Sequence, residues 1–387
     1  VAGTGFGAGT PAAGGFSGDG GPATAAKLNG PFAVAIDASG DIIFADRYNH
    51  VVRKVDPAGT ITTIAGLNTT AGYMGDGGMA TDAELNNPVG IAIDKTGNIF
   101  VADDHNNVIR KINTSGTIST VVGNTAAGRG GDGGPATAAS LNLPIGIALD
   151  TFGNLYIADS HNNVIRKVDT AGIISTYAGL DTAGYTGDGG PATLARLDSP
   201  QRIAFDDSNN MFISDFYNNV VRRVDYATGI ITTVAGDGYG AGTSGTVSGY
   251  SGDGGPATDA ELFLPHGVAF DHHHNFYICD RGNDVIRRVG PPPPVDHSGV
   301  HLVNGTTPNL LSVYPNPVRQ GMVSIELFAA IRDDVGLTLT DMLGKTVKKA
   351  QTTTNKRSDM MLNVPAGVYL LSATTSTGLW KTKLVVE

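Results

Sequence analysis

Hydrophobic residues recur over the first three quarters of the chain in short runs that are separated by polar turns. Five similar stretches each hold three apolar runs, split by a Gly- or Asn-containing turn and by a corner that begins with an aspartate. A fourth run, such as residues 59–66, follows every stretch except the last. Four short strands per repeat are typical of a β-propeller blade. The five stretches are residues 31–55, 88–112, 144–168, 200–224 and 265–289.

Each repeat also contains a G-D-G-G tetrapeptide, usually continued as P-A-T-x-A-x-L. Successive copies of its aspartate are 57, 56, 56 and 65 residues apart, more than the roughly 40–45 residues of a WD-type blade. The surplus lies in the connection from the outer strand of one blade to the inner strand of the next. The glycines suit positive φ, and the following segment suits a single helical turn started by proline. The aspartates are Asp19, Asp76, Asp132, Asp188 and Asp253.

The two ends of the repeat region predict how the ring closes. The fifth stretch runs into four prolines at 291–294 and lacks its fourth run. The chain begins V-A-G-T-G, which matches the end of a fourth run such as V-A-G-D-G at 234–238. We therefore expect residues 1–5 to complete the last blade of a five-bladed propeller without a free edge strand. A sixth blade would require sequence upstream of Val1.

Composition narrows the class of protein. With 54 glycines and almost no helix-forming runs, the 387 residues indicate an all-β chain. The net charge is −10 and basic residues are scattered, so no stripe for nucleic acid or anionic membranes is expected. The single cysteine, Cys279, excludes an internal disulfide framework. There is no transmembrane run and no leader, so we expect a soluble chain whose export signal has been removed.

The corner pattern A-D-x-x-N-x-[VI]-[IV]-R-[KR]-[VI] resembles the NHL repeat. The G-D-G-G-P-A-T linker resembles a subgroup that is common in secreted bacterial NHL proteins. The resemblance covers about three quarters of the chain and implies a β-propeller. His50 matches the histidine of the family in the first copy, whereas copies two to five have Asn or Asp there.

One face of the predicted disc should carry the longer loops, and binding usually belongs to longer loops on a rigid scaffold. On that face we expect the residue after each strand-opening proline and the residue after each corner aspartate to surround the channel mouth. Variation at these positions fits either a ligand site or an unused rim. The long loops 4–18 and 237–252 flank the fifth blade. We predict a polar ligand pocket near blades four and five, formed by Gln201, Arg202, His266 and Arg281, with Arg47 and Phe216 on the same rim.

Charged residues that recur in every repeat point to structure instead of chemistry. We expect the corner aspartates and the arginines to form ion pairs or corner hydrogen bonds. One G-D-G-G carboxylate per loop falls short of the several oxygen ligands that calcium needs, so a turn-stabilising role is expected and no metal or cofactor is predicted. The recurring residues are Asp46, Asp103, Asp159, Asp215 and Asp280, with Arg53, Arg110, Arg166, Arg222 and Arg287.

Motifs for catalysis are missing from the sequence: there is no nucleophile elbow, phosphate loop or H-E-x-x-H. Some NHL-like propellers are amidating lyases with channel histidines and a metal, and only His266 has such a position here. The histidine run 272–274 is expected to be a solvated turn, with weak transition-metal affinity as the alternative. The leading expectation is a non-catalytic binding or scaffold module for an extracellular protein, peptide or glycan. A metal-dependent lyase or hydrolase and a self-assembling extracellular subunit are the alternatives.

The C-terminal part of the chain follows a different pattern. Residues 1–290 hold the repeats, residues 291–308 form a Pro-rich linker, and residues 309–387 alternate as short strands. Strands are expected at 322–327, 335–340, 345–350, 358–362, 367–374 and 379–386, with a hairpin turn at 341–345. This pattern predicts a small immunoglobulin-like β-sandwich.

This C-terminal domain resembles the type A sorting domain of the Bacteroidetes type IX secretion system. The resemblance is carried by V-Y-P-N-P-V at 313–318, D-M-L-G-K-T-V at 341–347, P-A-G-V-Y-L-L at 365–371 and K-L-V-V at 383–386. It implies that residues 309–387 are recognised by the secretion machinery, that the protein is secreted or held at the outer cell surface, and that the domain is removed afterwards. An adhesion sandwich is the alternative.

Overall fold

A computed structural model describes residues 1–5, 14–67, 69–247, 249–271, 275–290, 310–314, 322–328, 333–341, 343–354, 356, 358–376 and 379–386. The chain divides into two compact units, Val1–Val289 and Gly290–Glu387. All the extended strands pair in antiparallel sheets, as the alternation of apolar and polar residues predicts. Among the described residues, no helix is long and apolar enough to cross a membrane.

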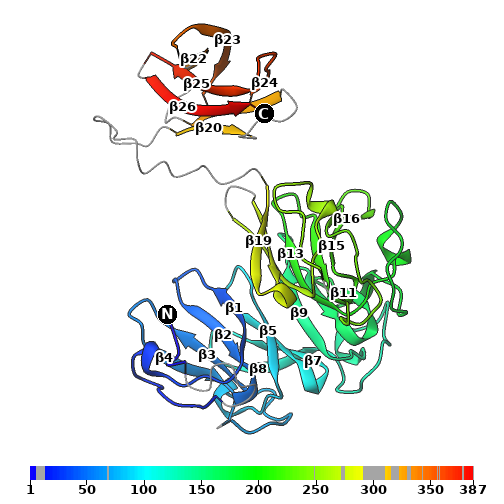
Figure 1. Ribbon diagram of the computed structural model, residues 1–387. Helices are drawn as coiled ribbons and strands as arrows, with labels where there is room; N and C mark the ends of the chain where they lie inside the picture. The colour runs from blue at the N-terminus through cyan, green and yellow to red at the C-terminus, as the bar shows by residue number, and fades with distance from the viewer. Residues whose placement is uncertain are drawn as a thin grey trace. The chain divides into compact units, whose positions relative to one another are not determined.

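The first unit consists of five consecutive antiparallel meanders (Figure 1). Four have four strands and the last has three in the described part of the chain. The sheets are β1(Pro31–Ile36) β2(Ile42–Asp46) β3(Val51–Val55) β4(Ile61–Ala65); β5(Pro88–Ile93) β6(Ile99–Asp103) β7(Val108–Ile112) β8(Ile118–Val122); β9(Pro144–Leu149) β10(Leu155–Asp159) β11(Val164–Val168) β12(Ile174–Ala178); β13(Pro200–Phe205) β14(Met211–Asp215) β15(Val220–Val224) β16(Ile231–Ala235); and β17(Pro265–Phe270) β18(Phe276–Asp280) β19(Val285–Val289).

The first strands of successive sheets lie side by side in chain order, from β1 through β5, β9 and β13 to β17. The core lies between neighbouring sheets, where apolar side chains of one meander pack on those of the next. Ile109 of β7, for example, shares a buried cluster with Ile147 and Ile157 of the following sheet. This arrangement is that of propeller blades, and it confirms the predicted all-β repeat architecture.

Two short 3-10 turns recur in each repeat. The corner turn, such as Asp104–Asn106, ends in a left-handed residue, here Asn107 at φ 55°. Asn and Asp tolerate this conformation, which explains why they replace histidine at the corner. The linker turn, such as Ala136–Ala138 after Pro135, confirms the predicted helical turn started by proline. Gly75 must be glycine because its φ is +93° and an added Cβ would lie 2.6 Å from Cα of Ala83.

The predicted closing strand is not found. Residues 1–5 lie in no strand and do not pair with β19. The amide of Gly3 instead donates to the carbonyl of Ala23 at 2.9 Å, as Gly66 does to Ala80 in the next repeat at 3.0 Å. The segment thus occupies the position that follows a fourth strand. Gly3 corresponds to Gly66, so Val1 and Ala2 correspond to the last two residues of β4, Ile64 and Ala65. Of these two only Ala65 pairs with β3, so residues 1–5 hold too little of a strand to pair.

The outer edge of β19 is therefore open in the described structure. Ile286 of β19 is 68% exposed, whereas its counterpart Ile109 is fully buried. On the first blade, Val34 and Ile36 of β1 are also exposed, at 65% and 68%. The first and last sheets consequently expose apolar side chains at positions where the other blades bury theirs against a neighbouring blade.

The second unit is a β-sandwich of two sheets whose facing side chains form one core. One sheet has the order β20(Leu310–Tyr314) β21(Met322–Phe328) β24(Ser358–Met361). The other has the order β23(Thr346–Thr353) β22(Asp334–Asp341) β25(Gly367–Thr374) β26(Leu379–Val386). The predicted strands are found with ends shifted by up to three residues, and β20 is an additional strand. The linker 291–308 lies outside the described residues.

Candidate ligand-binding site

The recurring charged residues are built into the frame of each blade. The carboxylate of Asp103 accepts hydrogen bonds from the backbone amide of Asn86 at 2.6 Å and the Nδ2 of Asn106 at 2.8 Å. Its Oδ2 also lies 3.6 Å from Nη1 of Arg110, and both side chains are fully buried. Burial raises the pKa of Asp103 to about 7, against these three favourable contacts. The same set recurs in the other four repeats.

The G-D-G-G aspartates have a role that the sequence did not reveal. Oδ1 of Asp76 lies 2.8 Å from Nη2 of the buried Arg110, so the linker carboxylate is the second partner of the blade arginine. Each of the other four linker aspartates pairs in the same way, at 2.6 to 2.7 Å. The expected turn-stabilising residue is therefore an ion-pair partner that ties each linker to the blade after it.

The residues that follow the opening prolines and corner aspartates do not share this frame. Phe32, at the start of β1, meets His266, at the start of β17, edge to face with ring centroids 5.0 Å apart. Phe216, just after the corner aspartate of the fourth repeat, lies with its ring centroid 6.1 Å from that of His266. Three repeats thus contribute aromatic rings to one place.

Three arginines surround these rings. The guanidinium carbon of Arg47 lies 5.2 Å from the centroid of Phe32, and that of Arg202 lies 5.1 Å from the same centroid. The guanidinium carbon of Arg281 lies 5.9 Å from the centroid of Phe216. We call Phe32, Arg47, Arg202, Phe216, His266 and Arg281 the mouth cluster.

Arg202 reaches this position because it stands where other repeats have Gly or Ala. Its Nη2 donates to the backbone carbonyl oxygens of Phe32 and Val89, each at 3.3 Å. Arg202 therefore links the fourth blade to the first and the second. Burial lowers the pKa of this guanidinium to about 10, which leaves it charged at neutral pH.

Positive charge prevails in the mouth cluster. Burial, reinforced by the charges of Arg202, Arg281 and Arg47, lowers the pKa of His266 to about 3, so the imidazole is neutral at physiological pH. Among the described ion pairs, the carboxylate that meets this cluster is that of Asp104, whose Oδ2 lies 3.7 Å from Nη2 of Arg47 and 3.0 Å from Nδ1 of His105. Two buried atoms here lack a hydrogen-bond partner, Nε of Arg47 and Oδ1 of Asp104.

Five of the six predicted ligand residues belong to the mouth cluster. Gln201 does not, because its buried amide donates to the hydroxyl of Ser199 at 3.1 Å, within the connection before β13. Phe32 and Asp104 stood among the expected rim positions, but no pattern in the sequence singled them out for the pocket. What distinguishes them is their contact with arginines from other repeats.

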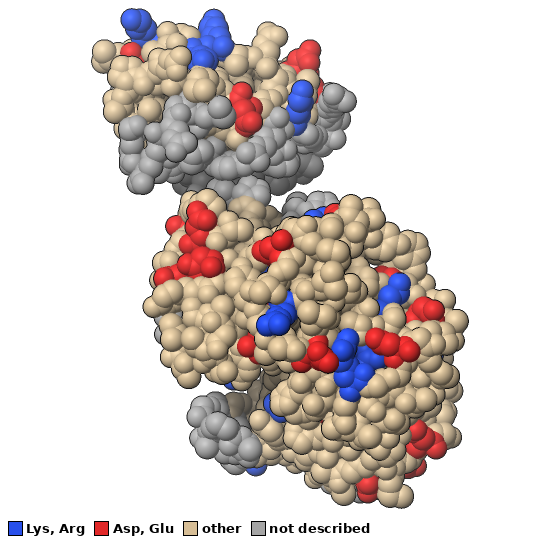
Figure 2. Space-filling model, turned by 90° about the vertical axis from the view of Figure 1, so that its right-hand side faces the viewer, with Lys and Arg blue, Asp and Glu red and all other residues tan. Residues whose placement is uncertain are grey.

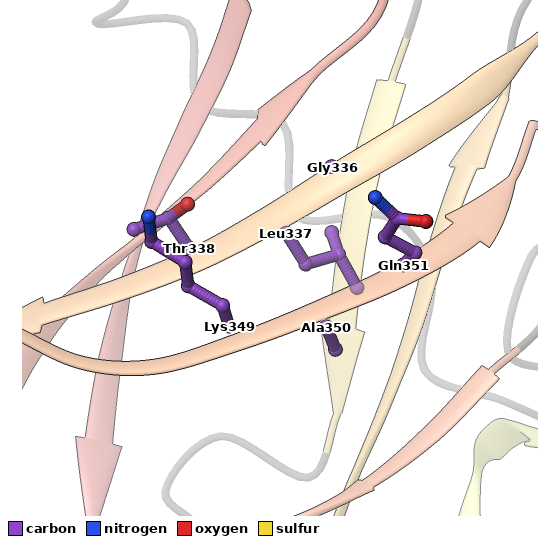
Figure 3. Close-up of a pocket in the computed structure, with 6 residues that line it drawn as sticks. All are labelled: Gly336, Leu337, Thr338, Lys349, Ala350 and Gln351. Atoms are coloured by element: carbon purple, nitrogen blue, oxygen red, sulfur yellow. The ribbon is translucent and has the colours of Figure 1, made fainter.

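Other described parts of the chain are weaker candidates for a ligand site than the mouth cluster. Among the described residues no three His, Cys, Asp or Glu side chains gather as metal ligands, and the run 272–274 lies outside those residues. A shallow hollow on the sandwich (Figure 3) is lined by three cross-strand pairs of β22 and β23, Gly336–Gln351, Leu337–Ala350 and Thr338–Lys349. It is a dent beside a glycine that has no side chain. The face in Figure 2 carries interspersed basic and acidic side chains and no basic stripe.

Comparison with known proteins agrees with both halves of the chain. A family model described as the teneurin NHL domain matches residues 1–73, 70–128 and 125–184. A model of the secretion system C-terminal sorting domain matches residues 312–387. The chain is 28% identical to teneurin-1 of Gallus gallus over 62% of its length and 10% of that protein. It is 33% identical to teneurin-3 of Danio rerio over 54% of its length and 8% of that protein. The chain thus spans about a tenth of these relatives or less.

Solved structures with a similar fold include a virginiamycin B lyase from Staphylococcus aureus. It is 12% identical, with 92% of this chain and 94% of that chain covered and a TM-score of 0.41. An auxiliary nutrient binding protein from Bacteroides ovatus is 16% identical, with 70% and 71% covered and a TM-score of 0.45. At such identities and scores, neither activity extends to this chain. The chain carries NHL repeats in a propeller-like fold, followed by a type IX secretion C-terminal sorting domain that marks it for export to the outside or the surface of the cell.

Proposed function

We propose that this exported protein is a non-catalytic binding module, whose five blades are one rigid scaffold and whose ligand binds at the mouth cluster. The observation that carries the proposal is that the buried Asp–Arg pairs are the same in every repeat, whereas the residues at the channel mouth are not. Every repeat keeps the same buried Asp–Arg frame. The rim positions differ from repeat to repeat, and residues from the first, fourth and fifth repeats converge on His266.

The state of His266 favours binding over catalysis. A general base works best with a pKa near the working pH, and the pKa of His266 is about 3. Its neighbours are arginines and aromatic rings, which do not ligate a metal ion. The metal-dependent lyase or hydrolase stays a weaker hypothesis, and nothing in the described contacts favours self-assembly.

The proposal is tested by screening the purified full chain on glycan and peptide arrays. The variant Phe216→Ala removes a ring of the mouth cluster, and the control Lys95→Ala changes the short turn between β5 and β6, at the opposite end of the strands from the corner turns. We expect an array signal that Phe216→Ala abolishes and Lys95→Ala leaves intact. A signal that survives Phe216→Ala unchanged would place the ligand elsewhere.

A further inference from the structure

Resting on this proposed function, we propose that the mouth cluster binds an acidic sugar, with the sugar carboxylate on the arginines and a sugar hydroxyl between Arg47 and Asp104. Three guanidinium groups lie around His266, and the neighbouring Asp104 is paired with only one of them. A neutral His266 adds no positive charge of its own, so the uncompensated charge is that of Arg202 and Arg281.

Arg281 is the group most ready to bind an anion. Its side chain is exposed, and among the described residues it makes no ion pair or side-chain hydrogen bond. A guanidinium matches a carboxylate with two parallel N–H···O bonds, and such charged bonds are stronger than neutral ones. Arg202, by contrast, already donates to the carbonyl oxygens of Phe32 and Val89 and serves as a fixed charge in the same cluster.

Arg47 and Asp104 also carry hydrogen-bonding atoms that have no partner. The Nε of Arg47 is an unused donor and the Oδ1 of Asp104 an unused acceptor. The two side chains are neighbours, because Nη2 of Arg47 lies 3.7 Å from Oδ2 of Asp104. A hydroxyl group accepts and donates at once, so one hydroxyl satisfies both atoms. Both atoms are buried in this structure, and we expect the Arg47 side chain, which is 23% exposed, to turn as the hydroxyl enters.

A carboxylate next to hydroxyl groups describes a uronic acid. An acidic peptide supplies the carboxylate but brings mainly carbonyl acceptors and amide donors, which fit this adjacent donor and acceptor less well. The sugar is therefore the ligand class that matches both features of the site.

The test is calorimetric titration of the full chain with a galacturonic acid trimer, a galactose trimer and an N-acetylated triglutamate peptide. We expect the acidic trimer to bind at least about 10-fold more tightly than the neutral one, with affinity falling as salt is added. Arg281→Met should weaken binding of the acidic trimer by about 10- to 100-fold, the range for a lost charged hydrogen bond. Because Arg281 is exposed, the thermal unfolding of the Arg281→Met variant should match that of the parent. The control variant Arg223→Met should bind the acidic trimer as tightly as the parent does.

The outcomes separate the two proposals. Equal binding of the acidic and neutral trimers, no binding of the acidic trimer, or tighter binding of the peptide overturns the acidic-sugar inference. In these cases array binding that depends on Phe216 still supports the proposed function. Binding of the acidic trimer that Arg281→Met and Phe216→Ala leave unchanged overturns both, because the sugar then sits outside the mouth cluster.

Discussion

The ring of Phe32, in the first blade, meets the ring of His266, in the last, edge to face with centroids 5.0 Å apart. The first and last repeats therefore come together at the mouth cluster, although the outer edge of β19 carries no fourth strand in the described structure. The contacts that assemble the candidate site are made by residues near the start of the inner strands and after the corners. The site thus depends on the inner strands, and the open outer edge can be tested separately.

The open edge predicts an unequal cost for two equivalent substitutions. Ile109→Ala should lower the free energy of unfolding by about 2–5 kcal/mol, because it leaves a cavity between buried sheets. Ile286→Ala should cost about 0.5 kcal/mol or less, because this side chain is 68% exposed. Urea denaturation of the two variants measures the difference. Equal losses would mean that a strand covers β19 in solution.

The buried ion pairs predict that the blade arginines are essential to stability. Arg110→Met leaves the carboxylate of Asp103 buried without its cation, and we expect a loss of about 3–5 kcal/mol. The matched control is Arg223→Met, whose pair with Asp225 is partly exposed on both sides, and it should cost about 1 kcal/mol or less. Denaturant midpoints of both variants measure the two losses of stability. Similar midpoints would contradict a structural role specific to Arg110.

The low pKa of His266 predicts a pH-dependent contribution to stability. An unfolded histidine has a pKa near 6.5, whereas burial lowers that of folded His266 to about 3. Between these values the unfolded chain binds a proton that the folded chain does not, so the contribution of His266 to stability rises with pH from about 3 to 6.5 and is constant above.

The variant His266→Gln removes this contribution. The parent should therefore lose stability relative to His266→Gln as the pH falls from 6.5, and the difference between the two should not change from pH 7 to 8. Thermal unfolding at several pH values measures the comparison. Parallel curves throughout would show that His266 is exposed to solvent and titrates normally.

The two-unit architecture predicts that the sandwich unfolds independently. Leu371 of β25 is fully buried in the sandwich core, so Leu371→Ala should destabilise that unit by about 2–5 kcal/mol. Trp380, the one tryptophan of the chain, packs against the same core, so its fluorescence reports this unit alone. The control Leu343→Ala changes a side chain that is 95% exposed and should have little effect. A matching shift in the unfolding of the repeats would argue against two separate units.

The sequence alone was sufficient for the repeating frame. Strand positions, the linker turn, the sandwich and the export signal follow from local patterns, because apolar alternation and turn residues act over a few neighbours. The buried Asp–Arg pairs were also foreseen, since a charge that recurs in every copy at one position is held by the frame. The second partner, such as Asp76 for Arg110, was missed because 34 residues separate the two.

The tertiary structure decided what lies between repeats. It brought Arg47, Arg202 and Arg281 around a neutral His266, left Gln201 bonded to Ser199, and showed residues 1–5 docked on the linker near Ala23 instead of on β19. These outcomes depend on contacts between side chains of distant repeats, because such contacts decide which groups are buried and which charges lie close together. Local patterns carry no information on these contacts, because they arise only when the blades are packed against one another.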